Sequence, residues 1–247
     1  MSVFCFQKIW KVVDYMGLNI ALTPRLKIIA DQINKNAVLA DIGTDHAHLP
    51  IYLVENGIIN NAVASDIRSG PLERAKQNVE KYGFEKNISL RLASGLDGVK
   101  PDECDTISIA GMGGETIAEI LNNAKWTNSK NYTLLLQPMT MISYLRKWLL
   151  QNGYEIIKET VCKEDKRRYV VITAKGGAEK QDIPLEKCVI SNALLKADGA
   201  YDYISHLLEK ENSVLDGLKQ AKNSDKQRID KQEIIVCTLK QGLEELK

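Results

Sequence analysis

The sequence predicts an open α/β domain with a mostly parallel sheet, followed by a smaller helical unit. Short apolar runs alternate with amphipathic stretches from about residue 20 to residue 175, as strands alternate with crossover helices. After residue 184 few strand signals remain, and apolar residues recur at helical spacing. The segment KGGAEKQDIP, residues 175–184, shifts to Gly, Lys and acidic residues and indicates a boundary between the two units.

Five parallel strands are expected, at residues 37–42, 62–66, 88–92, 106–110 and 132–137. A helix is predicted at residues 71–82, with Ser69 as its cap and Pro71 in its first turn.

Residues 154–161 and 168–174 are two further strand-like runs, separated by the charged turn CKEDKRR, and they predict a hairpin. A late antiparallel hairpin on a parallel sheet favours the Rossmann-like class I methyltransferase plan over a plain NAD-binding domain.

The C-terminal unit is expected to be an antiparallel helical hairpin of the coiled-coil kind, although one long helix would also fit. Its first apolar stripe contains Ile204, Leu208 and Leu215, and the stretch NSDK at residues 223–226 could turn the chain and cap a second helix. The predicted organisation is an N-terminal extension, a class I methyltransferase domain and a helical domain, at residues 1–15, 16–178 and 179–247.

The composition is that of an ordinary globular chain. Its net charge is close to zero, because 33 Lys and Arg residues are balanced by 32 Asp and Glu residues. The five cysteines are scattered without a C-x-x-C pair, which is typical of reduced thiols in a cytoplasmic protein. No apolar run approaches the length of about 18 residues that a membrane span needs. We therefore expect no membrane partner, and a monomer is favoured.

The loop DIGTDHAHLP, residues 41–50, follows the first strand, where the ligand crevice of such a sheet opens. It retains only Gly43 of the three glycines that usually admit a pyrophosphate. Asp45 adds negative charge, which predicts a ligand with a cationic group. S-adenosylmethionine fits, because it carries an ammonium and a sulfonium but no phosphate.

Three further stretches follow later strands at the same crevice. Asp66 ends the second strand at the spacing of an acidic residue that binds ribose hydroxyls, although it could instead cap the next helix. SGL at residues 94–96 lies where methyltransferases commonly hold adenine, and AGMGG at residues 110–114 brings the backbone close to the crevice, unless it is only a packing turn. The candidate cofactor residues are Asp41, Gly43, Asp66, Ile67, Ser94, Gly95, Leu96, Ala110, Gly111, Met112 and Gly113.

Together the stretches DIGTDHAHLP, ASDI, SGLDG, IAGMGG and LLQPM, with LTPRLKIIAD upstream, resemble the bacterial tRNA (adenine(22)-N1)-methyltransferase family, TrmK. The resemblance covers residues 16–247. It implies methyl transfer from S-adenosylmethionine to N1 of adenine 22 of tRNA, and a coiled-coil hairpin that also grips tRNA. The family commonly has Tyr where this sequence has His48, and Asn or Asp where it has Ser94.

The candidate catalytic residues are Asp45, His46 and His48. We expect Asp45 to accept a hydrogen bond from the adenine amino group, His46 to cap the loop or line the site, and His48 to stack on the base. The two histidines could be drawn as part of a metal site. Two histidines in a turn are more often hydrogen-bonded structural groups, and methyl transfer from a sulfonium needs no metal, so none is expected.

Gln137 could bind the target adenine or satisfy a backbone group before Pro138. Clusters of basic residues are candidates for tRNA contact or for solvated surface: Arg25 with Lys27, Arg146 with Lys147, and Lys163, Lys166, Arg167 and Arg168.

The alternatives to the leading function are a methyltransferase of the same fold acting on another RNA or a small molecule, and a non-catalytic RNA-binding protein.

Overall fold

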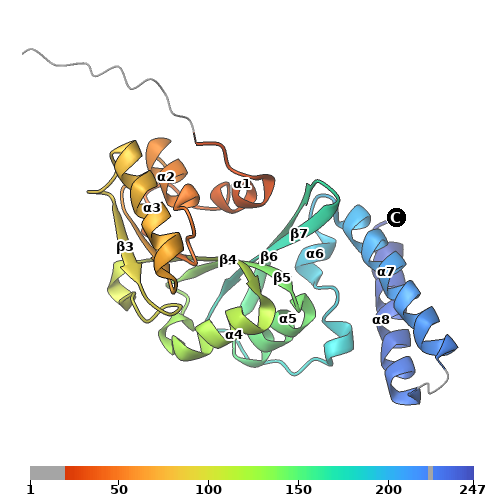
Figure 1. The fold of residues 1–247 in the computed structure, drawn as a ribbon. Coiled ribbons are helices and arrows are strands. Elements are labelled where there is room, and N and C mark those ends of the chain that lie inside the picture. Colours follow the sequence, from red (N-terminus) through yellow and green to blue (C-terminus); the bar gives the residue numbers. More distant parts are fainter. Residues whose placement is uncertain (1–19, 222–224) are drawn as a thin grey trace, which may run out of the picture.

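Seven strands form a single sheet in the order β3-β2-β1-β4-β5-β7-β6 (Figure 1). The computed structural model describes residues 20–221 and 225–247, so the proposed N-terminal extension lies outside the described residues. The strands are β1 (Leu39–Ile42), β2 (Ala62–Asp66), β3 (Ile88–Leu92), β4 (Thr106–Gly113), β5 (Thr133–Thr140), β6 (Glu155–Glu164) and β7 (Arg167–Lys175). Strands β1 to β5 pair in parallel, whereas β7 is antiparallel to both β5 and β6. The sheet therefore has the class I methyltransferase plan that the late hairpin predicted.

The helices of the sheet domain are α1 (Pro24–Ala30), α2 (His48–Glu55), α3 (Ser69–Tyr82), α4 (Gly114–Asn123) and α5 (Ile142–Gln151). They cover both faces of the sheet. Successive side chains of a strand point to opposite faces, and both faces carry buried apolar side chains that pack against these helices. Leu134 and Leu136 of β5 pack into a core with α4 and α5, while Leu135 between them packs into the core that contains α2 and α3. Among the described helices, none combines the length and the apolar character needed to cross a membrane.

The start of α3 differs from its prediction. Arg68, not Ser69, is the N-cap residue, and no side chain caps the helix at that position. The carboxylate of Asp66 instead accepts a hydrogen bond of 2.9 Å from the Arg68 amide, so the end of β2 shapes the turn that leads into the helix.

The C-terminal unit contains α6 (Asn192–Leu195), α7 (Ala200–Gln220) and α8 (Lys226–Glu245). Helices α7 and α8 pack side by side, which confirms the hairpin and makes the single long helix wrong (Figure 1). The turn lies partly in residues 222–224, outside the described part, but Asp225 caps α8 by accepting a hydrogen bond from the Gln227 amide. A third core joins this unit to the sheet through Val170 of β7, Ile204 of α7 and Leu239 of α8.

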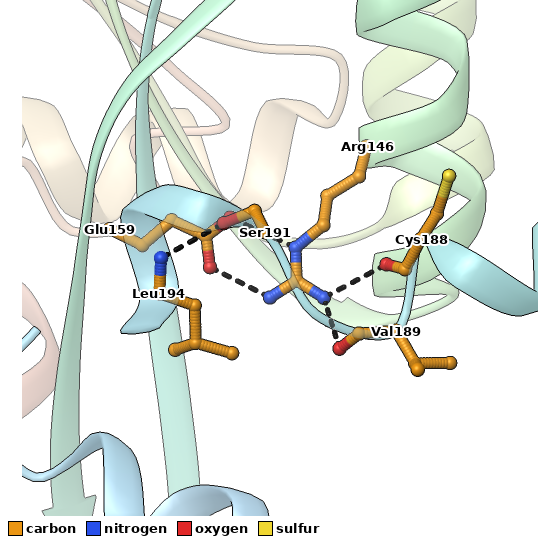
Figure 2. A network of polar contacts seen from close by, with 6 residues as sticks. All are labelled: Arg146, Glu159, Cys188, Val189, Ser191 and Leu194. Carbon is orange, nitrogen blue, oxygen red and sulfur yellow. Dashed lines mark hydrogen bonds and ion pairs between the residues drawn. The ribbon is translucent and has the colours of Figure 1, made fainter. Parts of the chain in front are cut away.

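A buried ion pair secures the connection between the sheet and the C-terminal unit (Figure 2). Arg146 of α5 donates two hydrogen bonds, of 2.9 and 2.7 Å, to the carboxylate of Glu159 on β6. A further guanidinium nitrogen donates to the carbonyls of Cys188 and Val189, and the hydroxyl of Ser191 donates to Glu159. Arg146 was a candidate for tRNA contact, and this was wrong, because only 2% of its side chain is exposed.

We predict that Glu159→Gln lowers the free energy of unfolding by about 3–5 kcal/mol, because it leaves the buried Arg146 charge without its counterion. Chemical denaturation of the full chain measures this loss. Asp202→Asn is the matched control, since its ion pair with Arg168 lies at the surface of the same region and its loss should cost much less. Equal losses in the two variants would contradict the role assigned to the buried pair.

Candidate functional site

A cleft of about 650 Å³ opens at the carboxyl ends of β1, β2, β3 and β4. Ligands of open α/β sheets bind at this edge because the loops that follow the strands diverge there. The predicted site residues that line it are Arg25, Asp41, Gly43, Asp45, His46, His48, Asp66, Ile67, Ser94, Gly95, Leu96, Ala110, Gly111 and Met112. The fold thus brings together residues that are up to 87 positions apart, from Arg25 to Met112.

The loop after β1 is a tight turn and not a phosphate cradle. Gly43 has a φ of 74°, a left-handed backbone conformation that favours glycine, and the terminal methyl group of Met112 lies against it. The Thr44 hydroxyl donates a hydrogen bond of 2.7 Å to Asp41, while the amides of Gly43 and Thr44 donate to the carbonyl of Ser65. The loop amides that would face a phosphate are therefore partly used within the protein.

Asp41 is an acid buried inside the sheet domain. Burial raises its pKa from 3.8 to about 6, although the hydroxyl of Thr44 opposes this change. In residues 20–221 and 225–247, no basic side chain forms an ion pair with it. A cation bound in the cleft would supply the missing positive charge.

The ends of β2 and β3 provide a polar and an apolar wall. Asp66 is buried and lines the cleft, with one carboxylate oxygen held by the Arg68 amide. The side chain of Ile67 beside it is 65% exposed, which leaves an apolar surface open within the cleft. Gly95, with a φ of 52°, carries the chain past Ile120 of α4. This end suits a nucleoside, with a carboxylate for ribose hydroxyls and aliphatic side chains for a base.

The end of β4 carries a bulge at the predicted glycine-rich stretch. The pairing with β5 shifts register between Ala110 and Met112, and Gly111 has a φ of 79° that favours glycine. Its amide donates to the Gln137 side-chain oxygen at 3.1 Å, and the same oxygen accepts a bond of 2.9 Å from the Arg25 guanidinium.

Gln137 itself is fully buried and does not line the cleft. Its amide nitrogen donates to the carbonyl of Pro138, so both ends of the side chain are occupied. The geometry favours the alternative in which Gln137 satisfies backbone groups, and not the alternative in which it binds the adenine.

The three candidate catalytic side chains form one group in the lining of the cleft. The carboxylate of Asp45 lies 3.6 Å from His46 and 3.7 Å from Arg74, and its side chain is 55% exposed. The rings of His46 and His48 stack with their centroids 5.2 Å apart. Burial, followed by the neighbouring His46, lowers the pKa of His48, so its ring is neutral at neutral pH.

Sequence reasoning missed one wall of the cleft and two supporting contacts. Helix α4 presents Thr116, Glu119, Ile120 and Asn123, whose spacing of three and four residues places them on one helix face. That spacing was visible in the sequence, but nothing in it distinguished a wall of the cleft from an ordinary solvent face. Thr44 beside Asp41 and Arg74 beside Asp45 depend on tertiary contacts.

Several predicted residues lie outside the cleft. Gly113 is the N-cap of α4 and does not line it. Lys163, Lys166 and Arg167 are exposed at the tip of the β6–β7 hairpin. Arg168 is held by two hydrogen bonds to Asp202 of α7 and is not a free cation for tRNA. Within the described ranges, no group of three or more His, Cys, Asp or Glu side chains could hold a metal ion.

The residues present fit S-adenosylmethionine. The cleft offers Asp66 and an apolar wall at the ends of β2 and β3, and an uncompensated acid, Asp41, at the end of β1. The use of the Gly43 and Thr44 amides in hydrogen bonds to Ser65 disfavours a pyrophosphate. The charge and shape of the cleft thus match a cationic nucleoside.

Comparisons with known proteins agree with this geometry. A family profile described as "Methyltransferase domain" matches residues 22–172. The tRNA (adenine(22)-N(1))-methyltransferase of Bacillus subtilis is 42% identical over 156 residues, and this match spans 63% of the chain and 66% of that protein, a little under two thirds.

Two solved structures extend the similarity over most of the chain. The crystal structure of the B. subtilis m1A22 tRNA methyltransferase TrmK superposes with a TM-score of 0.81 and 33% identity, covering 91% of this chain and 99% of that one. The Streptococcus pneumoniae protein Sp1610, described as a candidate tRNA (m1A22) methyltransferase in complex with S-adenosyl-L-methionine, gives a TM-score of 0.77 and 29% identity, covering 90% and 100%.

We predict that Asp41→Asn changes how stability depends on pH. The folded protein binds the Asp41 proton more tightly than the unfolded chain, so this group lowers the free energy of unfolding as the pH rises from about 4 through about 6. The loss amounts to up to about 3 kcal/mol. Asparagine should remove it, so the variant gains stability relative to the parent between pH 5 and pH 7.5 in urea denaturation. A constant difference between the two proteins over this range would contradict the prediction.

Proposed function

Because the chain belongs to the tRNA (adenine(22)-N1)-methyltransferase family, we propose that it transfers the methyl group of S-adenosylmethionine to N1 of adenine 22 in tRNA. The observation that carries this proposal is the combination of 42% identity to the B. subtilis enzyme with a cleft whose ends match the cofactor. Asp41, a buried acid without a basic partner, and Asp66 and Ile67 at the nucleoside end of the cleft all lie within the region that the methyltransferase profile matches.

The reaction asks the protein for positioning more than for proton transfer. Bound S-adenosylmethionine supplies a methyl group on a sulfonium; the N1–carbon bond forms as the carbon–sulfur bond breaks, and its electron pair goes to sulfur. Adenine N1 has its own lone pair, so no proton must leave before attack. N1 lies on the Watson–Crick edge, however, and the base must be unpaired to reach the cleft.

Asp45 is placed to hold the base and to stabilise its positive charge after methylation. Its contacts with His46 and Arg74 are long, 3.6 and 3.7 Å, and more than half of its side chain is exposed. The carboxylate is therefore free to accept a hydrogen bond from the adenine amino group. A negative charge near the ring favours the cation that forms as N1 acquires the methyl group.

His48 is assigned to stack on the adenine. Burial, followed by His46, lowers its pKa, and a neutral imidazole does not repel the positive charge that develops on the base. A protonated ring in the same place would oppose the reaction. His46 packs against the other face of His48 and fixes its orientation, which agrees with the expectation that His46 lines the site.

tRNA contact outside the cleft is assigned to the tip of the β6–β7 hairpin. Lys163, Lys166 and Arg167 are exposed there, and β6 contacts α1, which borders the cleft. Phosphates of a tRNA whose adenine enters the cleft can reach these cations. We also propose that the methyltransferase domain spans residues 16–178 and that the helical domain spans residues 179–247.

We further propose a cytoplasmic monomer. A tRNA substrate and the free thiols of Cys104, Cys162, Cys188 and Cys237 agree with a reducing, RNA-containing compartment.

The function is tested by incubating the full chain with S-adenosylmethionine and unmodified tRNA, then mapping the methylated nucleotide. We expect N1-methyladenine at position 22. Methylation at another position or of another RNA would favour a methyltransferase of the same fold with a different substrate. Binding of tRNA without any transfer would favour a non-catalytic RNA-binding protein.

Asp45→Ala should lower the rate of transfer at saturating substrate by about 100-fold, because the amino-group contact and the favourable charge are lost in the transition state. Binding of S-adenosylhomocysteine, measured by calorimetry, should remain near that of the parent. Asp102→Ala, which removes an exposed carboxylate outside the cleft, is the matched control and should retain most of the rate. A near-parental rate in Asp45→Ala with intact cofactor binding would remove Asp45 from the mechanism.

A further inference from the structure

The loop that carries the candidate catalytic side chains has an unusual backbone. Asp45 and Ala47 have φ values of 52° and 56°, a left-handed conformation that residues with a Cβ atom rarely adopt. This conformation costs free energy because the Cβ atom approaches the following carbonyl oxygen, and it persists where neighbouring groups hold it. Contacts with the rest of the protein must therefore fix the backbone of residues 45–47.

Helix α3 supplies such a contact through Asn78. The side-chain amide of Asn78 donates a hydrogen bond of 2.9 Å to the carbonyl oxygen of His46, the residue between the two left-handed positions. Asn78 is half-buried, so water competes less for this bond than it would at an exposed site. The peptide unit that joins His46 to Ala47 is thus held by a helix that is 32 positions away in the sequence.

Helix α3 is a firm support for this bond. Its residues Ala75 and Val79 are buried in the core cluster that also contains Ala47 of the loop. Val79 follows Asn78 directly, so the packing of the core sets where the Asn78 amide lies. A hydrogen bond from such an anchored side chain restricts the loop more than one from a mobile surface residue.

The second contact from α3 to the loop is weaker. Arg74 lies four residues before Asn78, so both side chains are on the same face of the helix. The Arg74 guanidinium is 3.7 Å from the Asp45 carboxylate, but the two side chains are 53% and 55% exposed. Water and salt screen such a pair. The half-buried hydrogen bond of Asn78 is therefore the contact that we expect to control the loop.

We propose that Asn78 is a positioning residue, which fixes the backbone at His46 and thereby directs the Asp45 carboxylate toward the target base. The inference rests on the proposed function for the role of Asp45. Asn78 does not line the cleft, so it acts only through the loop. Precise placement matters because a displacement of about 1 Å can cost about 100-fold in rate.

The test is a double-mutant cycle on the full chain with S-adenosylmethionine and unmodified tRNA. The single variants are Asn78→Ala and Asp45→Ala, and a third protein carries both changes. Asn78→Asp keeps the size of the side chain but loses the donor at neutral pH, and it replaces Asn78→Ala if that variant does not fold. Gln77→Ala removes an exposed amide from the same helix as the matched control.

Asn78→Ala should lower the rate of transfer at saturating substrate by about 10- to 100-fold, because the acceptor for the adenine amino group is no longer in place. Binding of S-adenosylhomocysteine should remain near that of the parent. In the Asp45→Ala background the same change should lower the rate by less than about threefold, because the group that Asn78 positions is already absent. Gln77→Ala should transfer methyl groups at the parental rate.

NMR follows the loop without the reaction. The chain has three histidines, so the ring signals of His46, His48 and His206 can be resolved. Loss of the Asn78 bond should weaken the contact between the two loop rings, whose centroids are 5.2 Å apart. The pKa of His48, which burial and then His46 hold below the ordinary value, should then rise. The signals of His206, which does not line the cleft, should not change.

Equal losses of rate from Asn78→Ala in both backgrounds would indicate a merely structural role and overturn the inference. A loss confined to the KM for tRNA, or loop histidine signals identical to those of the parent, would overturn it as well. If the parent protein transferred no methyl group to tRNA, the proposed function would fail and this inference with it. A parent that methylates adenine 22 while the two losses are equal would leave the proposed function standing and remove only the role of Asn78.

Discussion

The uncompensated acid at the end of β1 is the constraint on which the catalytic side of the molecule depends. Burying a carboxyl group without a cationic partner costs free energy, and the raised pKa of Asp41, about 6, expresses that cost. The loop that follows is shaped around it, through the Thr44 hydroxyl and the close approach of Gly43 to Met112. A cationic group bound beside Asp41 would offset this desolvation cost.

The strand order converts this local constraint into a direction along the cleft. Because β3, β2, β1 and β4 are neighbours in that sequence, the residues at their ends form a row: Ser94, Asp66, Asp41 and Gly111. This row suits an elongated ligand, because Asp66 can bind the hydroxyls of a nucleoside and the buried acid Asp41 can bind a cationic group. The strand order thus decides which of these side chains are neighbours along the cleft.

Much of this arrangement could be predicted from the sequence, because strand ends and loop chemistry are local properties. The limits of β2 and β3 and the row of cleft residues follow from apolar runs ending in Gly, Asp or Ser. Ser69 was predicted as a cap and is not one, because the competing carboxylate of Asp66 lies outside the helix signal. The basic clusters were indistinguishable in sequence, yet Arg146 is buried with Glu159, Arg168 is paired with Asp202, and Arg25 lines the cleft. Their partners are 13 to 112 positions away, so only the fold separates these roles.

Strand β7 connects the two halves of the molecule through adjacent side chains. Arg168 pairs with Asp202 at the start of α7, and the ring of Tyr169 lies under the Arg25 guanidinium at the cleft. The next residue, Val170, belongs to the core shared with α7 and α8. Successive residues of a strand point to opposite faces, so this one strand contacts the helical hairpin on one side and the cleft on the other. The buried Arg146–Glu159 pair fixes the neighbouring β6 against the chain that leads into the hairpin. The helical hairpin is therefore positioned relative to the cleft by packed strands and buried contacts.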